Sequence, residues 1–331
     1  MNTFGHTLKL SIFGEAAGDA IGIVLDGLPH GESISLPALR GALNAAHEAA
    51  AELSGRKFAP ETPAIVSGIL EGKTTGAPLC IMLPNNQTLW PAPKANLPRP
   101  GHPDIPARLR YQGFADSRGD GAYGERILTA VELAGAVCRQ ILARRGIKLS
   151  SKIVQVGEAK GKELDYHMRK EILQARSCGD SVGSVIRCKA NGVPAGLGGF
   201  FFESMQSRIS AMMCMLPGVT GVGFGDGFGM AALRGSIAND PIRIEGDNIF
   251  TETNHAGGLN CGITNGMPLI VRVALRPTPS ITRTQDTVDL ETMTNASISS
   301  VGRFDPCLAP RTIPAAEAVL AFCILDAMED R

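Results

Sequence analysis

Residues 67–84 read SGILEGKTTGAPLCIMLP. The apolar run at 79–83 stands between two prolines, which predicts a short buried strand with a turn at each end. The GKT at 72–74 looks like the end of a phosphate-binding P-loop. That motif needs a glycine five residues before its second glycine, and Ser67 stands there instead. The stretch therefore predicts a core strand behind a glycine-rich turn, and nucleoside triphosphate binding is not expected.

Predicted strands and helices extend outward from this strand in both directions. The apolar periodicity of 36–53, with Leu39 and Leu43 on one face, predicts a helix. Strands and helices alternate without a strict βαβ rhythm, which predicts mixed sheets covered by helices, an α/β chain of the α+β type. Because there is no repeat and no linker-like segment, we expect one domain over residues 1–331. The other expected elements are strands at 7–12, 21–26, 149–156, 181–190, 219–225 and 268–275, and helices at 123–143, 202–215 and 314–328.

Composition argues against several classes of partner. Lys and Arg together number 32, as do Asp and Glu, so the formal net charge is zero and neither nucleic acid nor a membrane is expected as a partner. The chain has no run of about 18 apolar residues and no secretory signal at its start, so we expect a cytoplasmic protein. The eight cysteines form no C-x-x-C pair and are expected to be reduced and buried. The six histidines lack metal-ligand spacing, so no metal is expected.

A long stretch at 84–122, expected to be irregular, is dense in proline, glycine, asparagine and arginine. Loops of that length inside a compact domain are usually functional or disordered, and this composition favours function. The stretch contains RPGH at 99–102 and leads into a glycine-rich segment at 118–126. Arginines on glycine-rich loops suit a phosphate or carboxylate ligand, because the guanidinium fork bonds two oxygens at once. An arginine beside His102 favours a neutral ring or an anionic neighbour, and a purely structural histidine stays an alternative.

Two C-terminal regions also carry more functional side chains than turns require. The segments 253–258, 262–266 and 276–280 combine glycine-rich turns, hydroxyl groups and an arginine. That composition suits either an anion cradle or turns that simply flank a strand. Farther on, Arg303 and Asp305 are two residues apart on an extended segment and point the same way, so they form either a salt bridge or a functional pair.

Short motifs in a fixed order carry a family resemblance. They are NTFG at 2–5, IFGE at 12–15, SGILEGKTTG at 67–76, RPGH at 99–102, DSVG at 180–183, VPAGLG at 193–198, GDGF at 225–228, ALRGS at 232–236, NHAGG at 254–258, PTPS at 277–280 and GRFDPC at 302–307. In this order they resemble the chorismate synthase family over nearly the whole chain. The resemblance implies a β-α-β sandwich, assembled as a homotetramer, that binds reduced FMN.

The implied activity is that of a lyase in the shikimate pathway of aromatic amino acid biosynthesis. It eliminates phosphate and a proton from the small anionic substrate 5-enolpyruvylshikimate 3-phosphate to give chorismate. There is no net redox change, although the flavin must be reduced. No dinucleotide fingerprint in the sequence suggests a built-in NADPH-dependent reductase.

The resemblance also implies roles for particular residues. His102 matches the family's histidine near the departing phosphate, and Asp305 matches the carboxylate that helps to handle the flavin N5 proton. Arg99, Arg126 and Arg303 match basic residues around the substrate and the flavin. The implied cofactor-binding positions are Ala122, Tyr123, Gly124, Pro217, Gly218, Asn254, Ala256, Cys261, Arg276, Pro277, Thr278, Pro279, Ser280 and Arg303.

The chain departs from the family's pattern mainly on the substrate side. Ala17 stands where the family has a histidine expected to protonate reduced flavin, and an alanine cannot move a proton. The family's arginine-rich segment before SGILEG is absent, and one arginine and two serines of the glycine-rich segment are replaced, while Asp120 and Glu125 add negative charge. Cys261 replaces a glycine, and Arg276 replaces a lysine. Three hypotheses follow: a divergent chorismate synthase, a catalytically degenerate paralogue that keeps the fold and anion or flavin binding, or a lyase for another anionic substrate.

Overall fold

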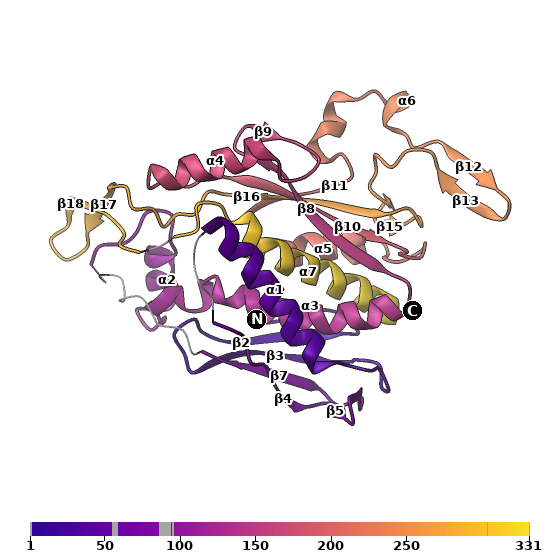
Figure 1. The fold of residues 1–331 in the computed structure, drawn as a ribbon, viewed down its shortest axis with the longest axis horizontal. Helices are drawn as coiled ribbons and strands as arrows, with labels where there is room; N and C mark the ends of the chain where they lie inside the picture. The colour runs from indigo at the N-terminus through magenta and orange to yellow at the C-terminus, as the bar shows by residue number, and fades with distance from the viewer. Residues whose placement is uncertain (1, 55–58, 86–93, 95, 303, 331) are drawn as a thin grey trace.

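The structure is a computed structural model that describes residues 2–54, 59–85, 94, 96–302 and 304–330. Two five-stranded sheets enclose a layer of helices, so the chain forms a β-α-β sandwich (Figure 1). This arrangement confirms the α+β class and the sandwich. All strand pairs of the described residues are antiparallel, so the expectation of mixed sheets is wrong.

Each of the two sheets has one face on the helical layer. The first has the order β1-β2-β3-β7-β4 and the second β11-β16-β10-β8-β9. The strands of the first are β1 (Thr3–Phe4), β2 (Lys9–Gly14), β3 (Ala20–Asp26), β4 (Ala64–Ser67) and β7 (Leu79–Pro84). Those of the second are β8 (Lys148–Val156), β9 (Ala159–Lys160), β10 (Ser184–Asn191), β11 (Val219–Phe224) and β16 (Leu269–Leu275).

The helical layer consists chiefly of α1 (Leu36–Ser54), α3 (Arg126–Arg144) and α7 (Ala309–Glu329), which lie between the sheets (Figure 1). Helix α7 is buried along most of its length, and Phe322 is among the largest fully buried side chains. Side chains of β10 alternate between buried and half-buried, as expected for a strand with one face on the helices. At Gly135 of α3, a Cβ would lie 2.1 Å from the Cβ of Ala318, so the missing side chain permits close approach of α3 and α7.

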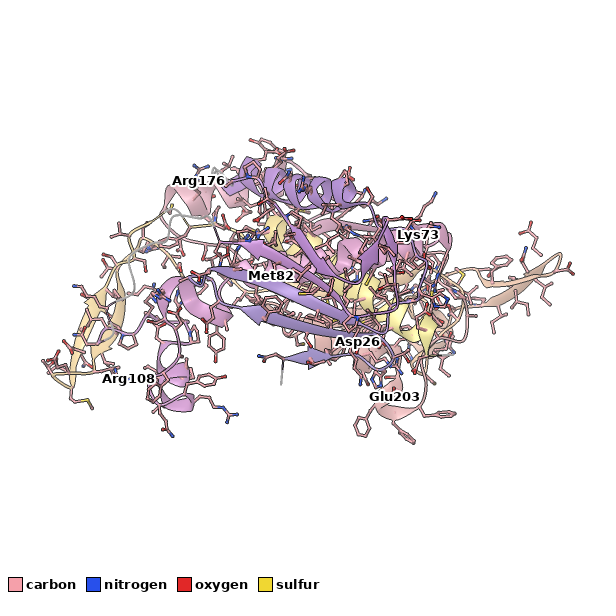
Figure 2. All side chains as sticks on the ribbon, turned by 90° about the horizontal axis from the view of Figure 1, so that it is seen from below. Asp26, Lys73, Met82, Arg108, Arg176 and Glu203 are labelled. Atoms are coloured by element: carbon pink, nitrogen blue, oxygen red, sulfur yellow. The ribbon has the colours of Figure 1, made fainter. Side chains whose placement is uncertain are left out.

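Smaller elements extend the sandwich at both ends. The hairpin of β12 (Ile242–Glu245) and β13 (Asn248–Thr251) projects from one end, and that of β17 (Gln285–Asp289) and β18 (Thr294–Ile298) from the other (Figure 1). Figure 2 shows Arg108 of helix α2 (Asp104–Arg110) at the β17–β18 end. The remaining elements are α4 (Tyr166–Ser177), α5 (Met205–Met213), α6 (Gly235–Ala238), the 3₁₀ segments η1 (Arg118–Tyr123), η2 (Phe201–Glu203) and η3 (Gly227–Ala232), and the short strands β5 (Ile69–Leu70), β6 (Lys73–Thr74), β14 (Leu259–Asn260) and β15 (Ile263–Thr264).

Most expected elements are confirmed with ends shifted by a few residues. The stretch 84–122 was expected to be irregular, which is wrong because it contains α2 and η1. The last helix begins at Ala309 rather than at 314, since its first turn is buried and Pro314 is tolerated inside it. The helix expected at 202–215 is the 3₁₀ turn η2 followed by α5. Helix α4 and the two projecting hairpins were not predicted.

All eight cysteines are free, and burial is confirmed for Cys138, Cys188, Cys307 and Cys323. It is wrong for Cys178, Cys214 and Cys261, which are exposed. Within the described ranges, none of the helices combines the length and apolar character needed to cross a membrane.

Candidate active site

The first group of candidate site residues lies on the loop that precedes α2. Asp104 begins that helix, and its carboxylate accepts hydrogen bonds from the Arg99 backbone at 2.8 Å, from Arg99 Nε at 2.9 Å and from Arg99 Nη2 at 2.7 Å. Such a two-pronged pair fixes both side chains. Burial opposes ionisation of Asp104, but the hydrogen bonds from Arg99 outweigh it and hold the pKa of that carboxyl below its ordinary value. Arg99 is therefore a fixed cation at the start of the loop.

A second carboxylate reaches the same arginine from η1. Gly119, Asp120 and Gly121 have φ of 58°, 69° and 55°, a left-handed conformation that is unusual for a residue with a side chain. It places Asp120 Oδ1 2.6 Å from Arg99 Nη2 and 3.6 Å from His102 Nδ1. Burial raises the pKa of Asp120, but His102 and Arg99 outweigh that effect and leave the pKa below its ordinary value. The anionic neighbour expected for His102 is therefore Asp120.

His102 joins this loop to the segment at 276–280. Its side chain is only 5% exposed, and Nε2 lies 3.0 Å from the Ser280 hydroxyl. Arg276 Nη1 donates to the Gly101 carbonyl at 3.1 Å. A Cβ on Gly101 would lie 2.6 Å from Arg276 Nη2, so glycine permits this approach. Two segments that are remote in sequence thus form one site.

The segment at 276–280 is anchored by its backbone and leaves one hydroxyl unsatisfied. The Arg276 amide donates to the Gly218 carbonyl at 2.9 Å, beside Pro217, and the Ser181 hydroxyl donates to the Thr278 carbonyl at 2.7 Å. The Thr278 hydroxyl is buried and has no hydrogen-bond partner among the residues that the structure describes. A buried polar group without a partner costs free energy, which a ligand oxygen at this position would recover.

Asp305 lies at the same end of the sandwich and is 3% exposed. The Pro306 carbonyl next to it accepts the Val182 amide at 2.8 Å, beside the serine that holds Thr278. Asp305 therefore belongs to the same region as the 276–280 segment. Arg303 lies outside the described residues, so its expected pairing with Asp305 and its expected ligand contacts stay predictions.

Arg126 is engaged inside the sandwich. Its guanidinium pairs with the Glu61 carboxylate through both terminal nitrogens, and its Nε donates to Asn85 Oδ1 at 2.8 Å. The Asn85 amide in turn donates at 2.9 and 2.8 Å to carbonyls on either side of Ala17. In this structure Arg126 supports the turn that carries Ala17, and its expected contact with the substrate stays a prediction.

The three residues at 122–124 lie against that same turn. A Cβ on Gly124 would be 3.2 Å from the Cβ of Ala16, which places the segment directly beside the altered signature. Ala122 is exposed, and the Tyr123 phenol is hydrogen-bonded with Tyr111 at the end of α2, which raises the pKa of Tyr123. Tyr123 therefore connects η1 to α2.

Three expected cofactor positions, Asn254, Ala256 and Cys261, lie elsewhere. The Asn254 side-chain amide donates to the Pro268 carbonyl at 2.8 Å, just before β16, whereas Arg276 directly follows the other end of that strand. Seven residues of strand span about 20 Å. Cys261 has a φ of 49°, in keeping with a position where the family has glycine. Asn254 and the 276–280 segment thus lie at opposite ends of β16.

A hollow of about 500 Å³ on the second sheet has no part in this site. Its lining includes Arg187 and Arg272, which are cross-strand partners on β10 and β16. Arg272 Nε donates to the Gly225 carbonyl at 2.7 Å. None of the sequence-predicted site residues lines this hollow.

Three residues that shape the site were not among the predicted site residues. Asp120 was noted only as an added negative charge, although a carboxylate between two glycines signals a turn that aims it. Glu61 gave no signal in the sequence, and Ser181 stood out only as part of the DSVG motif, because their roles depend on contacts with Arg126 and Thr278. Contacts of that kind become visible only with the fold.

Fold and site together define a class of protein: a β-α-β sandwich in which a buried histidine and two arginines gather at one end of its sheets. Comparisons with known proteins narrow that class. A family model described as chorismate synthase matches residues 8–328. The chorismate synthase of Thermococcus kodakarensis is 38% identical, over 97% of this chain and 96% of that protein. The chorismate synthase of Pyrococcus abyssi is 37% identical over the same shares.

A solved structure of a chorismate synthase has the same fold. It matches with a TM-score of 0.76 at 24% identity and covers 99% of this chain and 93% of that one. The chain belongs to the chorismate synthase family.

Proposed function

We propose that this protein is a chorismate synthase that eliminates phosphate from 5-enolpyruvylshikimate 3-phosphate. The C–O bond to the phosphate and one ring C–H bond break, a C=C bond forms, and inorganic phosphate and a proton leave. The observation that carries the proposal is the 3.0 Å approach of His102 Nε2 to the Ser280 hydroxyl, which joins the two loops that the family resemblance implicates. Family membership supplies the identity of the substrate.

The described residues suggest a separate chemical role for each of three side chains. His102, held by Ser280, would hold a proton near the departing phosphate oxygen. Arg99 would stabilise the negative charge that develops there. Asp305 would handle a proton on the cofactor side of the site, where it is buried.

Reduced FMN fits the segment at 276–280. Arg276, Thr278 and the backbone near Gly218 would hold its phosphate, and the unsatisfied Thr278 hydroxyl is the observation that supports this fit. When bound, the reduced flavin supplies electron density that assists departure of the substrate phosphate. The protein's own part is to position the groups and to exclude water.

A catalytically degenerate paralogue is the second candidate, and one observation favours it. Arg126 is held by Glu61 and Asn85, and the histidine expected at Ala17 is missing, so one function expected at the substrate and one expected at the flavin lack a free side chain in this structure. Loss of one acid–base group commonly costs about 10²–10⁴-fold in rate. We therefore expect turnover below that of relatives with the full signature.

Assembly as a homotetramer is also part of the proposal. Asn254, which is bonded to the residue before β16, is about 20 Å along that strand from Arg276, and contact with a neighbouring copy would bring the two groups together. The β12–β13 hairpin exposes Ile242, Ile244 and Ile249, which suits contact with another copy. Sedimentation at micromolar concentration should give the mass of four chains, and a monomer would contradict the proposal. We expect the assembly to act in the cytoplasm.

The test of function is anaerobic incubation with reduced FMN and 5-enolpyruvylshikimate 3-phosphate, with chorismate as the readout. Accumulation over many turnovers supports the proposal. FMN binding without chorismate formation would favour the degenerate paralogue. If neither FMN binding nor chorismate formation is detected, the protein has kept only the fold of the family.

A further inference from the structure

Asp120 occupies a position that an anionic ligand of this site would also need. Its Oδ1 is 2.6 Å from Arg99 Nη2 and 3.6 Å from His102 Nδ1, the two groups assigned above to the departing phosphate. We propose that Asp120 is a specificity-determining residue, an internal counter-ion that a phosphate-bearing ligand must displace from Arg99. The identity of the ligand rests on the proposed function, whereas its class, an anion of more than one charge such as a phosphate, is inferred from the charges of Arg99, His102 and Asp120.

The charge balance around Arg99 is the first argument. Arg99 already pairs with Asp104 and Asp120, so its single positive charge faces two carboxylates before any ligand arrives. An incoming phosphate would meet Asp120 within a few ångströms, and like charges at about 4 Å repel strongly in partly buried surroundings. Binding is therefore opposed for as long as Asp120 stays in place.

The two carboxylates differ in how firmly they are held. Asp104 accepts three hydrogen bonds from Arg99, including one from its backbone, and also begins α2. Asp120 contacts Arg99 through one oxygen and is 28% exposed, against 17% for Asp104. It also has a left-handed φ of 69° between two glycines, where the backbone can rearrange at low cost. Asp120, rather than Asp104, is accordingly the carboxylate that a ligand displaces from Arg99.

This arrangement would select among anions. A phosphate dianion can engage Arg99 and His102 with more charge than a carboxylate, so it competes better with Asp120. Singly charged carboxylates would gain too little to displace it. Asp120 thus lowers affinity for all anions and discriminates in favour of the most highly charged ones.

The experiment compares Asp120→Asn and Asp120→Gly with the natural protein. Asn keeps the size and removes the charge, while Gly also suits the left-handed backbone, so at least one variant should fold normally. Asp116→Asn is the matched control, because it removes the same charge from the same segment, and Asp116 pairs with Arg118 instead. Calorimetric titrations with inorganic phosphate and with 5-enolpyruvylshikimate 3-phosphate are made with oxidised FMN present, so that no turnover occurs.

Both Asp120 variants should tighten the Kd for each phosphate probe by about tenfold or more, and Asp116→Asn should change it less than about twofold. Unchanged or weaker phosphate binding in both Asp120 variants would overturn the proposal, as would absence of phosphate binding in every protein. Tighter inorganic phosphate binding, with no binding of the enolpyruvyl substrate by any variant, would uphold the role of Asp120 and reject the proposed function.

Discussion

His102 and Ser280 are 178 residues apart in the sequence, yet His102 Nε2 lies 3.0 Å from the Ser280 hydroxyl. One residue is on the loop before α2 and the other follows β16, so the contact exists only because the fold brings that loop to the C-terminal end of β16. The imidazole is thereby fixed between a hydroxyl and the Asp120 carboxylate. A histidine held in this way is suited to proton transfer.

Replacing this histidine should remove most of the activity. His102→Ala should lower kcat by about 10²–10⁴-fold, because an imidazole can both accept and donate a proton near neutral pH, whereas its neighbours at this position are a carboxylate and a hydroxyl. His167→Ala is the control, since His167 is exposed near the start of α4 and packs beside Tyr166, so the change should leave kcat unchanged. Equal rates for His102→Ala and the natural protein would remove His102 from the mechanism.

The Thr278 hydroxyl should matter for cofactor binding rather than for folding. Thr278→Val removes a buried hydroxyl that has no partner among the described residues, so the free energy of unfolding without ligand should stay the same or rise. The free energy of binding reduced FMN should become less favourable by about 0.5–1.5 kcal/mol, the usual net contribution of one hydrogen bond, and the Kd should rise accordingly.

Thr74→Val is the control for the predicted stability of Thr278→Val, because the Thr74 hydroxyl is buried and has partners. The buried Thr74 hydroxyl donates to the Pro29 carbonyl at 2.5 Å and accepts the Glu32 amide at 2.9 Å. Its loss should lower the free energy of unfolding by about 1–3 kcal/mol, because both partners are left unsatisfied. Urea unfolding of both variants is the measurement, and a Thr278→Val protein as unstable as Thr74→Val would show that Thr278 has a structural role.

Two glycines inside helices should respond in opposite ways to alanine. Gly135→Ala places a methyl group 2.1 Å from the Ala318 Cβ, so α3 and α7 must move apart, and overpacking of this kind costs about 1–3 kcal/mol. Gly41→Ala in α1 meets no atom within 4 Å and should stabilise the protein by about 0.5–1 kcal/mol. Thermal unfolding of the two variants measures both effects. Equal responses would mean that the packing of α3 on α7 is looser than described.

Glu132 should give the stability a distinct pH dependence. It is buried beside Arg311, with Arg311 Nη1 3.3 Å from Glu132 Oε1, and burial raises its pKa from 4.5 to about 7 despite that arginine. The folded protein therefore binds this proton more tightly than the unfolded chain does. The resulting stabilisation is complete below the unfolded pKa and is lost as the pH rises through about 7.

Glu132→Gln keeps the shape of the side chain and cannot ionise, so it tests that sign. Its stability relative to the natural protein should rise between pH 5 and pH 8, as measured by urea unfolding at each pH. A relative stability that stays constant or falls would show that Arg311 keeps Glu132 ionised.

Much of the fold follows from hydrophobic periodicity. The leucines of 36–53 predict α1, and the run at 79–83 predicts β7, because each pattern fits one geometry. The start of α7 could not be predicted, since Pro314 argues against a helix that extends upstream, and only the burial of residues such as Thr312 overrides it. The antiparallel pairing likewise depends on contacts between distant strands.

The candidate site, like the fold, could be predicted from the sequence only in part. His102 and Ser280 follow from motifs whose order along the chain is diagnostic. The pairing of Arg99 with Asp120 depends on a left-handed turn at Asp120; the flanking glycines indicate a turn, but the sequence does not show that its carboxylate reaches Arg99. The separation of Asn254 from Arg276 depends on the length and direction of β16. Motif resemblance identifies residues, whereas only the fold shows which of them meet.

The most direct test of the proposed function is the product balance under anaerobic conditions with reduced FMN. Chorismate and inorganic phosphate should form from 5-enolpyruvylshikimate 3-phosphate in equal amounts, and both should fall together in His102→Ala. Phosphate release without chorismate, or no release of either product, would contradict the assignment of this chain as a working chorismate synthase.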